Sequence, residues 1–549
     1  MRSLLVSLLA LGAQLTKAFT PTTPEVAWKS MHPGWNLGNT LDGIPSEGDW
    51  GNPPVTADVF TKIKAQGYKS VRIPVTWTHH FLAGNNTVDP TWMNRVETVV
   101  DMALAEGLWV IVNVHHDSWE WFDMSSPTIE KEQKFEDLWT QIAARLSLKS
   151  EHLILEALNE PAGGGTKANA DAYNNADLQF QNIVRNSGGY NKNRITSLEP
   201  LNGNSDYGNA WFYKIPAGWG DKWSYQFHFY SPYDFLWNAW GKTAWGTDAD
   251  KAAVWQQMAD VAGNFTGIPT SIGEFGSTDS GKINESASVW LWFDYVIRTA
   301  RHFGFVTFMW DNGSFFDRSA GAWRDTTLGQ VMKYAHMNVT NTLAEPGNAT
   351  VWLRQGDLIV DKTIALRFGG NTLAGVYNGA GQALTSGTQY TASSTGVTLK
   401  ASYLSSLLIP GKPLGSLGTI VIKSNKGADL KIDIRFYKTP TVATSSYQSP
   451  STSSSLSIPV TLNGAKLATA KAIKADGSIL KDDWTIYLPE SQAGRLTWGD
   501  FDTNESNTLT LSSSVIGMIQ NAHQAVTVTF EFWPRYDPLN TVPITISYV

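Results

Sequence analysis

Short apolar runs alternate with longer helical patterns across residues 19–341, and this alternation constrains the fold more than any other feature of the sequence. Four of the helical patterns cover residues 57–66, 91–106, 129–146 and 287–303. The apolar runs are predicted strands that end at Asn36, Pro74, His115, Glu160, Pro200, Tyr230, Glu274 and Asp311. Eight strands that alternate with helices predict a (β/α)8 barrel, an α/β fold in which the C-terminal ends of the strands surround one mouth.

Beyond residue 341 the helical periodicity ends and runs of period two take over. Such runs cover residues 363–368, 397–400, 419–423 and 430–436, and they predict a β-sandwich of immunoglobulin-like size. A segment rich in Ser, Thr and Pro follows at 439–455 and is a predicted linker. Further β-type runs cover 458–462, 484–487, 526–532 and 542–548. We therefore expect a barrel over 19–342, a sandwich over 345–438 and a small β domain over 456–549.

The N-terminus has the pattern of a secretory signal peptide over residues 1–18. Arg2 supplies a positive charge, residues 4–11 form a short apolar core, and Ala18 is a small residue suited to cleavage. We therefore expect the protein to be secreted and extracellular. No later apolar run is long enough to span a bilayer, so no membrane association is expected.

If the source is eukaryotic, seven Asn-X-Ser/Thr sequons are expected glycosylation sites. They lie at Asn85, Asn264, Asn284, Asn312, Asn338, Asn348 and Asn504.

The composition excludes several partners and several kinds of chemistry. The chain has no cysteine, which rules out disulfides, thiol catalysis and cysteine-ligated metals. The net charge is -7 and no basic stripe is present, so no nucleic-acid partner is expected. A large barrel uses many aromatic residues, but 24 tryptophans also favour a carbohydrate ligand, because aromatic faces stack on sugar rings. The protein is expected to be a monomer.

Two glutamates follow apolar runs and are the candidate catalytic pair. The run at 153–158 leads directly into Asn159, Glu160 and Pro161, and a second run closes on Gly273 and Glu274. A polar strand end that arose by chance is the alternative for the first motif alone. Two carboxylates at the exits of two barrel strands are the minimum equipment for hydrolysing a glycosidic bond.

Retaining hydrolysis requires one protonated and one ionised carboxyl group, roughly 5 Å apart. Glu160 is the expected acid, because the adjacent Asn159 can bind a sugar hydroxyl instead. Glu274 is the expected nucleophile, provided that a cation and hydrogen-bond donors keep it ionised. Arg72, near the end of the second predicted strand, supplies such a cation. A surface ion pair is the alternative for an arginine in this position.

Other polar residues at the predicted strand ends are expected to line the same mouth. The run His115-His116-Asp117 invites a metal site, but neighbouring strand residues point to opposite sides, so the two histidines do not easily bind one ion. Hydrogen bonding is therefore expected, with no metal and no other cofactor. His228 and Tyr230 share one strand face, where the Tyr230 hydroxyl can donate to the nucleophile, and core packing is the alternative. Trp310 is a candidate floor for a sugar-binding subsite.

Seven short motifs follow one another along the predicted barrel. They are Gly34-Trp35-Asn36-Leu37-Gly38-Asn39, Arg72-Ile73-Pro74, His115-His116, Asn159-Glu160-Pro161, His228-Phe229-Tyr230, Gly273-Glu274-Phe275 and Trp310. Together they resemble glycoside hydrolase family 5, in its endo-β-1,4-glucanase (cellulase) branch. The resemblance implies that Glu160 is the acid/base and Glu274 the nucleophile. It implies a supporting shell of Arg72, His115, Asn159, His228, Tyr230 and Trp310, to which we add Asn36 and His116 as substrate-binding candidates.

Two further resemblances concern the β domains. The stretches at 360–364, 370–373, 384–388 and 402–404 are similar to the X2-type immunoglobulin-like module of bacterial cellulases. The stretches at 462–467, 483–484 and 529–533 are similar to family 46 carbohydrate-binding modules. The second resemblance makes Trp484, Trp498 and Trp533 candidate ligand-binding residues. A place in the core of the domain is the alternative for these tryptophans.

The sequence as a whole predicts a secreted, retaining endo-β-1,4-glucanase that cleaves internal bonds of cellulose and related β-glucans by double displacement. Within the enzyme class the alternatives are a xyloglucanase, a mixed-linkage glucanase or a mannanase, because one barrel serves all of these activities. The alternative from another class is a polysaccharide-binding protein without catalysis, and the presence of both glutamates argues against it. The expected partner is a β-glucan polysaccharide.

Overall fold

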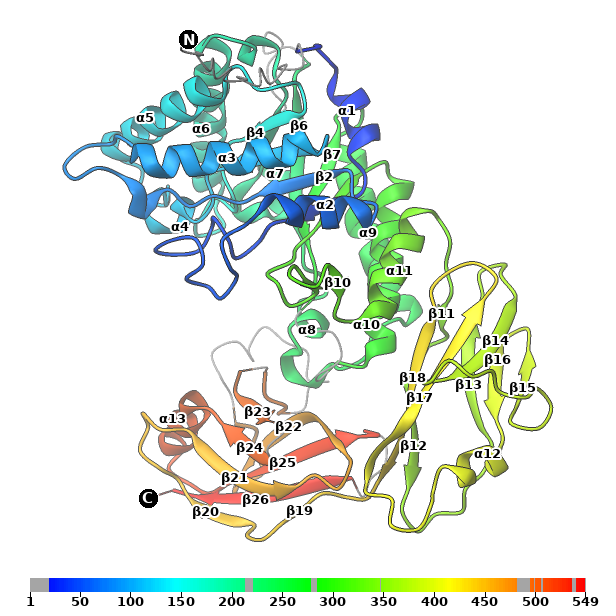
Figure 1. Ribbon diagram of the computed structural model, residues 1–549. Coiled ribbons are helices and arrows are strands. Elements are labelled where there is room, and N and C mark those ends of the chain that lie inside the picture. The colour runs from blue at the N-terminus through cyan, green and yellow to red at the C-terminus, as the bar shows by residue number, and fades with distance from the viewer. Residues whose placement is uncertain are drawn as a thin grey trace, which may run out of the picture. The chain divides into compact units, whose positions relative to one another are not determined.

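The computed structural model describes residues 19–212, 221–277, 284–345, 347–480, 494–497, 499–504, 507–535 and 540–548 (Figure 1). The predicted signal peptide lies outside these residues, as do Trp484 and Trp498. Contacts within the chain define two units, one of Met1–Phe227 and Gly267–Ser271, the other of His228–Thr266 and Ile272–Val549. Both units contribute strands to the barrel.

Eight strands close into a barrel in chain order, which confirms the predicted (β/α)8 fold. The registers between neighbours from β1 to β6 are parallel. Apart from Trp223, every strand residue is buried, as expected where helices cover a barrel whose interior is filled by side chains. The strands are β1 Gly34–Asn36, β2 Ser70–Ile73, β3 Trp109–Asn113, β4 Leu153–Glu156, β5 Thr196–Leu198, β6 Trp223–Phe229, β7 Thr270–Phe275 and β8 Val306–Met309.

The four helices predicted by residue range agree with the structure to within one residue at each end. α3 illustrates why: the Asp89 side chain caps the N–H of Thr91, Pro90 takes the first turn, and Gly107 with φ of 76° follows the end. The α-helices of the barrel region are α1 Pro24–Met31, α2 Ala57–Ala65, α3 Pro90–Ala105, α4 Asp117–Glu120, α5 Ile129–Leu146, α6 Lys167–Asn186, α7 Ser205–Trp211, α8 Tyr233–Leu236, α9 Asp248–Asn264, α10 Ser286–His302 and α11 Thr326–His336. The short 3-10 turns are η1 Thr78–His80, η2 Asn191–Asn193, η3 Leu201–Gly203 and η4 Ala239–Gly241.

Two strand ends that matter for the site were predicted wrongly. β4 ends at Glu156, so Asn159 and Glu160 lie in the following loop and not at the strand end. A strand cannot extend through Glu160, because its φ of 40° is left-handed. β3 ends at Asn113 and not at His115, because the chain turns into α4 directly after it.

Two small all-β parts follow the barrel, as predicted, and each contains two four-stranded sheets. The first comprises the sheets β11-β13-β16-β15 and β12-β18-β17-β14, and the second comprises β19-β21-β24-β23 and β20-β26-β25-β22. The elements from the end of the barrel onward are β9 Phe316–Asp317, β10 Ala322–Trp323, β11 Thr342–Leu343, β12 Thr350–Arg354, β13 Lys362–Arg367, β14 Leu373–Asn378, β15 Tyr390–Ser393, β16 Gly396–Leu399, α12 Ala401–Ser406, β17 Gly415–Ser424, β18 Leu430–Tyr437, β19 Thr441–Val442, β20 Ser446–Gln448, β21 Leu456–Thr461, β22 Lys466–Lys474, β23 Phe501–Asn504, β24 Thr508–Leu511, α13 Ser513–Asn521, β25 Val526–Trp533 and β26 Thr541–Ser547.

The segment 439–455, predicted as a linker, is in fact part of the last β domain. β19 pairs with β21, and β20 pairs with β26. Val442 and Tyr447 from these two strands pack against the core that includes Ile458, Leu509 and Phe530. The Ser, Thr and Pro content that suggests a tether lies mostly in the turns around these two short edge strands.

Trp533 lies at the end of β25 and is only 7% exposed. A ring with so little exposure cannot stack on a sugar, so the structure favours the alternative of a core residue for this tryptophan. Among the described helices, none combines the length and the apolar character that a membrane crossing requires.

Candidate active site

A buried ion pair joins β2 to β4 inside the first unit. Arg72 on β2 and Glu156 at the end of β4 are both fully buried. The guanidinium donates through Nε, 3.1 Å from each carboxylate oxygen, and through Nη2, 2.8 Å from Oε1. A forked pairing of this kind compensates both charges away from water. The cation that we expected to keep Glu274 ionised is thus already paired with Glu156, a partner absent from the sequence analysis.

The same guanidinium also holds two amides of the predicted shell. Nη1 donates to Asn36 Oδ1 at 3.0 Å, and Nη2 donates to Asn159 Oδ1 at 2.7 Å. Asn113, at the end of β3, donates to Glu156 Oε1 at 2.8 Å. The first four strands therefore share one network. Because the oxygen of Asn159 accepts from a cation, its amide NH2 group is the part available to donate to a substrate hydroxyl.

His115 is 1% exposed, and its contact with Asn113 selects the tautomer of the neutral ring. The Asn113 Oδ1 accepts the backbone N–H of Val75 at 3.1 Å, which fixes the orientation of the amide. The amide nitrogen of Asn113 lies 3.0 Å from Nδ1 of His115. Since an amide nitrogen only donates, Nδ1 accepts, and a neutral His115 carries its proton on Nε2. Nε2 is then a hydrogen-bond donor.

Glu160 lies in the loop after β4 with a left-handed backbone, φ of 40°. The loop is tied down on both sides: the N–H of Asn159 donates to Val114 O at 2.9 Å, and the N–H of Asn202 donates to Pro161 O at 2.9 Å. Burial raises the pKa of the Glu160 carboxyl to about 7, although the charge of Arg72 opposes this shift. Glu160 is thus protonated in part of the molecules at neutral pH, as a general acid must be.

The two histidines after β3 lie side by side, contrary to the prediction that they point to opposite sides. Their ring centroids are 4.5 Å apart at 71°, because His116 already has helical backbone angles, φ of -72° and ψ of -7°. Atoms of Asp42, His115 and His116 able to ligate a metal lie within 4.8 Å of one another. Burial, followed by the charge of Arg72, lowers the pKa of His116 to about 4, so its imidazole is neutral at neutral pH.

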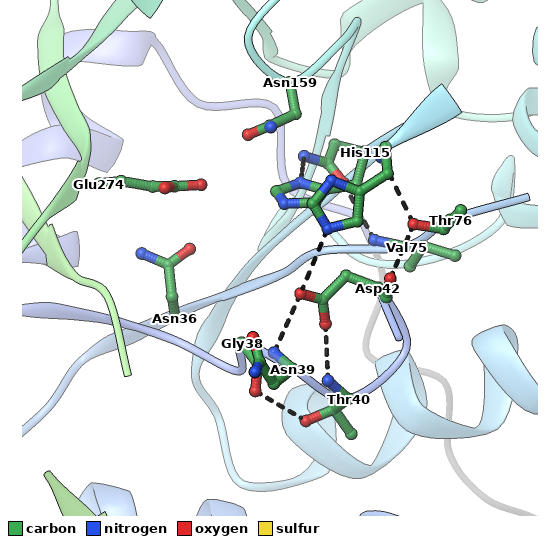
Figure 2. Close-up of polar contacts among 12 residues, drawn as sticks. Asn36, Gly38, Asn39, Thr40, Asp42, Val75, Thr76, His115, Asn159 and Glu274 are labelled. Atoms are coloured by element: carbon green, nitrogen blue, oxygen red, sulfur yellow. Dashed lines mark hydrogen bonds and ion pairs between the residues drawn. The ribbon is translucent and has the colours of Figure 1, made fainter. Parts of the chain in front are cut away.

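Asp42 is held in the loop after β1 by the backbone of that loop (Figure 2). Its carboxylate accepts the N–H of Asn39 at 2.9 Å and the N–H of Thr40 at 2.6 Å. His116 Nε2 lies 3.9 Å from the same carboxylate. The Thr76 hydroxyl donates to the carbonyl of Asp42 at 3.0 Å, which connects this loop to the one after β2.

In the second unit, Glu274 on β7 is 5% exposed and lies close to His228 on β6 and to Tyr230 directly after it. The Tyr230 hydroxyl donates to Oε2 at 2.9 Å. His228 Nδ1 lies 3.6 Å from the same oxygen. A hydrogen bond from the hydroxyl favours the ionised carboxylate. Of the two alternatives left open for His228 and Tyr230, the geometry fits the contact with the carboxylate.

Trp310 follows β8 and is half-buried. The backbone N–H of Trp310 donates to Phe275 O at 2.9 Å, which continues the pairing of β7 and β8 past Glu274. A Cβ atom added at Gly276 would lie 3.5 Å from Trp310 O and 4.0 Å from the Tyr230 ring. These are ordinary van der Waals distances, so the backbone after Glu274 passes beside both aromatic residues.

Four fully buried polar residues close to the strand ends were not among the predicted site residues: Asp42, Asn113, Asp117 and Glu156. Asp117 is fully buried and accepts from the Trp77 N–H, the Thr78 hydroxyl and the Trp121 indole, each at 2.8 Å. One signal was present in the sequence, since Glu156 is a charged residue inside an otherwise apolar run. Such a residue implies a buried partner, but it does not reveal which one.

β4 and β7 are strands of the same closed barrel, and the C-terminal ends of such strands surround one mouth. The loop after β4 carries a carboxyl group with a raised pKa, and β7 carries a carboxylate that accepts a tyrosine hydroxyl. A barrel with two carboxyl groups in such different environments has the equipment of a glycoside hydrolase.

Comparison with known families agrees with this class. The model of the cellulase family, glycosyl hydrolase family 5, matches residues 31–316, and that of carbohydrate binding domain X2 matches residues 347–434. The chain therefore belongs to glycosyl hydrolase family 5 and is a cellulase-type glycoside hydrolase.

Similar proteins match this chain over nearly its whole length. Endoglucanase B of Paenibacillus lautus is 32% identical over 541 residues, which cover 94% of this chain and 91% of that protein. A tri-modular family 5, subfamily 4 endo-β-1,4-glucanase from Bacillus licheniformis, solved with cellotetraose, has 33% identity and a TM-score of 0.86. The match covers 96% of this chain and 100% of that one. Full-length endo-β-1,4-glucanase B from Bacillus halodurans has 29% identity and a TM-score of 0.84, with coverage of 96% and 100%.

Proposed function

We propose that this protein is a secreted, retaining endo-β-1,4-glucanase that hydrolyses internal bonds of cellulose and related β-glucans. Glu160 is the general acid and base, and Glu274 is the nucleophile. The similar proteins named above carry the endoglucanase name, and one of them was solved with cellotetraose, which supports a β-1,4-glucan as substrate.

The observation that carries the proposal is the difference between the two glutamates. Burial raises the pKa of Glu160 to about 7, which keeps a proton on this carboxyl group near neutral pH. Glu274 accepts the Tyr230 hydroxyl at 2.9 Å, which favours its ionised form. Double displacement requires this combination of one proton donor and one anionic nucleophile.

In the first step, the Glu274 carboxylate attacks the anomeric carbon while Glu160 protonates the departing glycosidic oxygen. The bond between sugar and leaving group breaks, and a glycosyl ester forms on Glu274. In the second step, Glu160 removes a proton from water, which attacks the anomeric carbon and releases Glu274 as a carboxylate. Asn159 and the Nε2–H of His115 are donors suited to sugar hydroxyls during both steps.

The two roles predict different responses to the leaving group. Glu274→Gln should abolish hydrolysis of all substrates, because an amide does not form the glycosyl ester. Glu160→Gln should lose about 10²–10⁴-fold on cello-oligosaccharides, the usual range for general acid catalysis. The same variant should lose much less on aryl cellobiosides with acidic phenols, which depart without protonation. Steady-state rates on a series of aryl cellobiosides measure the difference.

Glu132→Gln is the matched control, since Glu132 is an exposed glutamate on α5. It should behave as the unaltered protein does. If Glu160→Gln and Glu274→Gln respond identically to the leaving group, the assigned roles are wrong. If the unaltered protein binds β-glucans but releases no reducing ends, the alternative of a polysaccharide-binding protein without catalysis holds.

Xyloglucan, mixed-linkage glucan and mannan remain alternative main substrates within the family. Product chromatography on a panel of these polysaccharides with carboxymethylcellulose ranks them.

We expect no metal requirement, so dialysis against a chelator should leave the rate unchanged. The cluster of Asp42, His115 and His116 makes this control necessary. A rate that is lost and then restored by one divalent cation would show that a metal takes part.

Secretion is the remaining part of the proposal, and N-terminal sequencing of exported protein tests cleavage after residue 18.

If export is eukaryotic, the sequons differ in accessibility. Asn284 is 3% exposed and its amide donates to Phe235 O at 2.6 Å, so a glycan on it is incompatible with the fold. The exposed sequon residues whose side chains the structure describes are Asn85, Asn264, Asn312 and Asn338.

A further inference from the structure

Trp119 is an exposed tryptophan that nevertheless makes a specific polar contact with the site. It lies on α4, directly after β3, and half of its side chain, 51%, is exposed. Its indole Nε1–H donates to the backbone carbonyl oxygen of Glu160 at 3.3 Å. This hydrogen bond joins the loop after β3 to the loop after β4, at the residue proposed as the acid/base.

The backbone of Glu160 is in a conformation that a residue with a Cβ adopts only at a cost. Its φ of 40° is left-handed, and such conformations persist where surrounding contacts impose them. The residues on either side are fixed by bonds to Val114 O and from Asn202 N–H, both 2.9 Å long. The contact from Trp119 fixes the peptide group between them, which sets the direction in which the Glu160 side chain leaves the backbone.

The helix that carries Trp119 is well anchored, as a positioning element has to be. The buried carboxylate of Asp117, the first residue of α4, accepts from Trp77 N–H, the Thr78 hydroxyl and the Trp121 indole, each at 2.8 Å. The ring of Trp119 also packs against His116, with centroids 4.5 Å apart. Because Asp117 connects α4 to the loop after β2, these hydrogen bonds hold the backbone of Trp119 in place.

We propose that Trp119 is a positioning residue for the acid/base. Its indole N–H holds the left-handed peptide of Glu160 and so keeps the carboxyl group at the depth and angle needed to protonate the leaving oxygen. The proposal rests on the function proposed above, because it concerns the acid role of Glu160. Trp119 acts through Glu160, and substitutions at Trp119 distinguish this role from a direct contact of the ring with substrate.

Trp119→Phe tests the proposal, because it removes the indole N–H while keeping an aromatic ring, and the smaller ring is matched in the Trp121→Phe control. We expect kcat on cellotetraose to fall about 2–10-fold with little change in KM, the range for loss of one neutral hydrogen bond. Hydrolysis of 2,4-dinitrophenyl β-cellobioside should stay within about twofold, because this leaving group needs no proton. The basic limb of the pH profile for kcat/KM should move to lower pH as the Glu160 carboxyl gains access to water.

Trp121→Phe is the matched control, since it removes an indole N–H from the same segment whose acceptor is Asp117 and not Glu160. It should lower the melting temperature without any dependence of rate on the leaving group. Trp119→Ala removes the ring as well, so an additional rise in KM beyond that of Trp119→Phe reports contact of the ring with substrate. The melting temperature of each variant shows whether the fold is intact.

A Trp119→Phe variant that is slowed equally on both substrates, or that resembles Trp121→Phe in every respect, overturns the positioning role. A raised KM with unchanged kcat overturns it too, since that result assigns Trp119 to substrate binding alone. The Glu160→Gln variant, measured on the same substrates, distinguishes a failure of the Trp119 role from a failure of the acid role of Glu160. If Glu160→Gln depends on the leaving group and Trp119→Phe does not, only the role of Trp119 fails. If Glu160→Gln shows no such dependence, the proposed acid role fails first.

Discussion

At the scale of single residues, the site depends on placing two glutamates in opposite surroundings. Glu160 is in a loop where burial raises the pKa of its carboxyl group to about 7. Glu274 is on a strand and accepts a hydrogen bond from Tyr230. The two side chains are identical, but Glu160 retains a proton near neutral pH and Glu274 does not need one. Burial in the loop after β4 causes the first property, and the hydrogen bond from Tyr230 supports the second.

The raised pKa of Glu160 has a consequence for stability as well as for rate. In the unfolded chain the pKa of a glutamate is near 4.5, and in the folded chain that of Glu160 is about 7. Between these values the folded state holds the proton more tightly, so its stability falls as the pH rises from 4.5 to 7. Glu160→Gln removes the titration and should unfold with a higher free energy than the unaltered protein at pH 8.

The gain should be at most about 3 kcal/mol, since one pKa unit corresponds to about 1.4 kcal/mol and Glu160 is partly exposed. At pH 4 both proteins should be equally stable, because the carboxyl is then protonated in both states. Urea unfolding at the two pH values measures this, and Glu132→Gln should show no such dependence. In the unaltered enzyme, the basic limb of kcat/KM should fall near pH 7. Equal stability of the Glu160→Gln variant and the unaltered protein at pH 8 would contradict the raised pKa.

At this scale the sequence identified the residues better than their placement. Glu160 and Glu274 could be recognised because each follows an apolar run and matches a family motif. The position of Glu160 beyond the end of β4 could not, because the hydrogen bonds around this residue come from Val114, Trp119 and Asn202 in other segments. The same holds for His116, whose ring turns towards His115 because a helix begins there.

At the scale of elements, one buried ion pair organises the ends of the first four strands. Arg72 on β2 is forked onto Glu156 on β4, and amides from β1, β3 and the loop after β4 complete the network. The network fixes Asn159 beside Glu160. An error in the position of any one of these strands would therefore be transmitted to the acid/base.

Breaking this pair on one side should be costly. Glu156→Gln leaves the buried cation of Arg72 without a counter-charge and should lower the free energy of unfolding by about 3–5 kcal/mol. Glu97→Gln is the matched control, because Glu97 pairs with Arg145 and Lys149 near the protein surface, where the Arg145 side chain is 43% exposed. That change should cost less than about 1 kcal/mol. Denaturant unfolding followed by tryptophan fluorescence measures both, and equal losses would show that the buried pair has no special role.

The elements themselves were largely predictable, and their polar partners were not. Apolar periodicity and end signals such as Asp89, Pro90 and Gly107 depend on neighbours in the sequence, so the extents of α3 and α5 were predicted to within one residue. The pairing of Arg72 with Glu156 spans 84 positions and depends on which strands become neighbours in the barrel. Such a partner becomes apparent only when the topology is known.

At the scale of the whole molecule, the chain is a catalytic barrel followed by two small β domains. The predicted tether before the last domain does not exist as such, because β19 and β20 belong to the sheets of that domain. Low-complexity composition is a poor guide here, since short edge strands with few apolar residues leave almost no period-two signal. Val442 and Tyr447 are the residues that connect these strands to the core.

This assignment predicts where the last domain can be cut. A fragment of residues 439–549 should unfold cooperatively on heating, and a fragment of residues 456–549 lacks β19 and β20. Loss of the packing of Val442 and Tyr447 should cost a few kcal/mol, which for a domain of this size lowers the melting temperature by about 10 °C or more. A fragment that begins at residue 444 lacks only β19 and should fall between the two. Equal melting temperatures would mean that the segment is a linker after all.

The most direct test of the central claim is to trap the glycosyl-enzyme intermediate. A 2-deoxy-2-fluoro-β-cellobioside with a good leaving group should inactivate the enzyme. The fluorine slows both displacements, and the good leaving group accelerates only the first, so the glycosyl-enzyme accumulates. Peptide mapping by mass spectrometry should then locate one cellobiosyl-type adduct, on Glu274. An adduct on Glu160, or rapid turnover to an α-configured product with no adduct on any residue, would contradict the account.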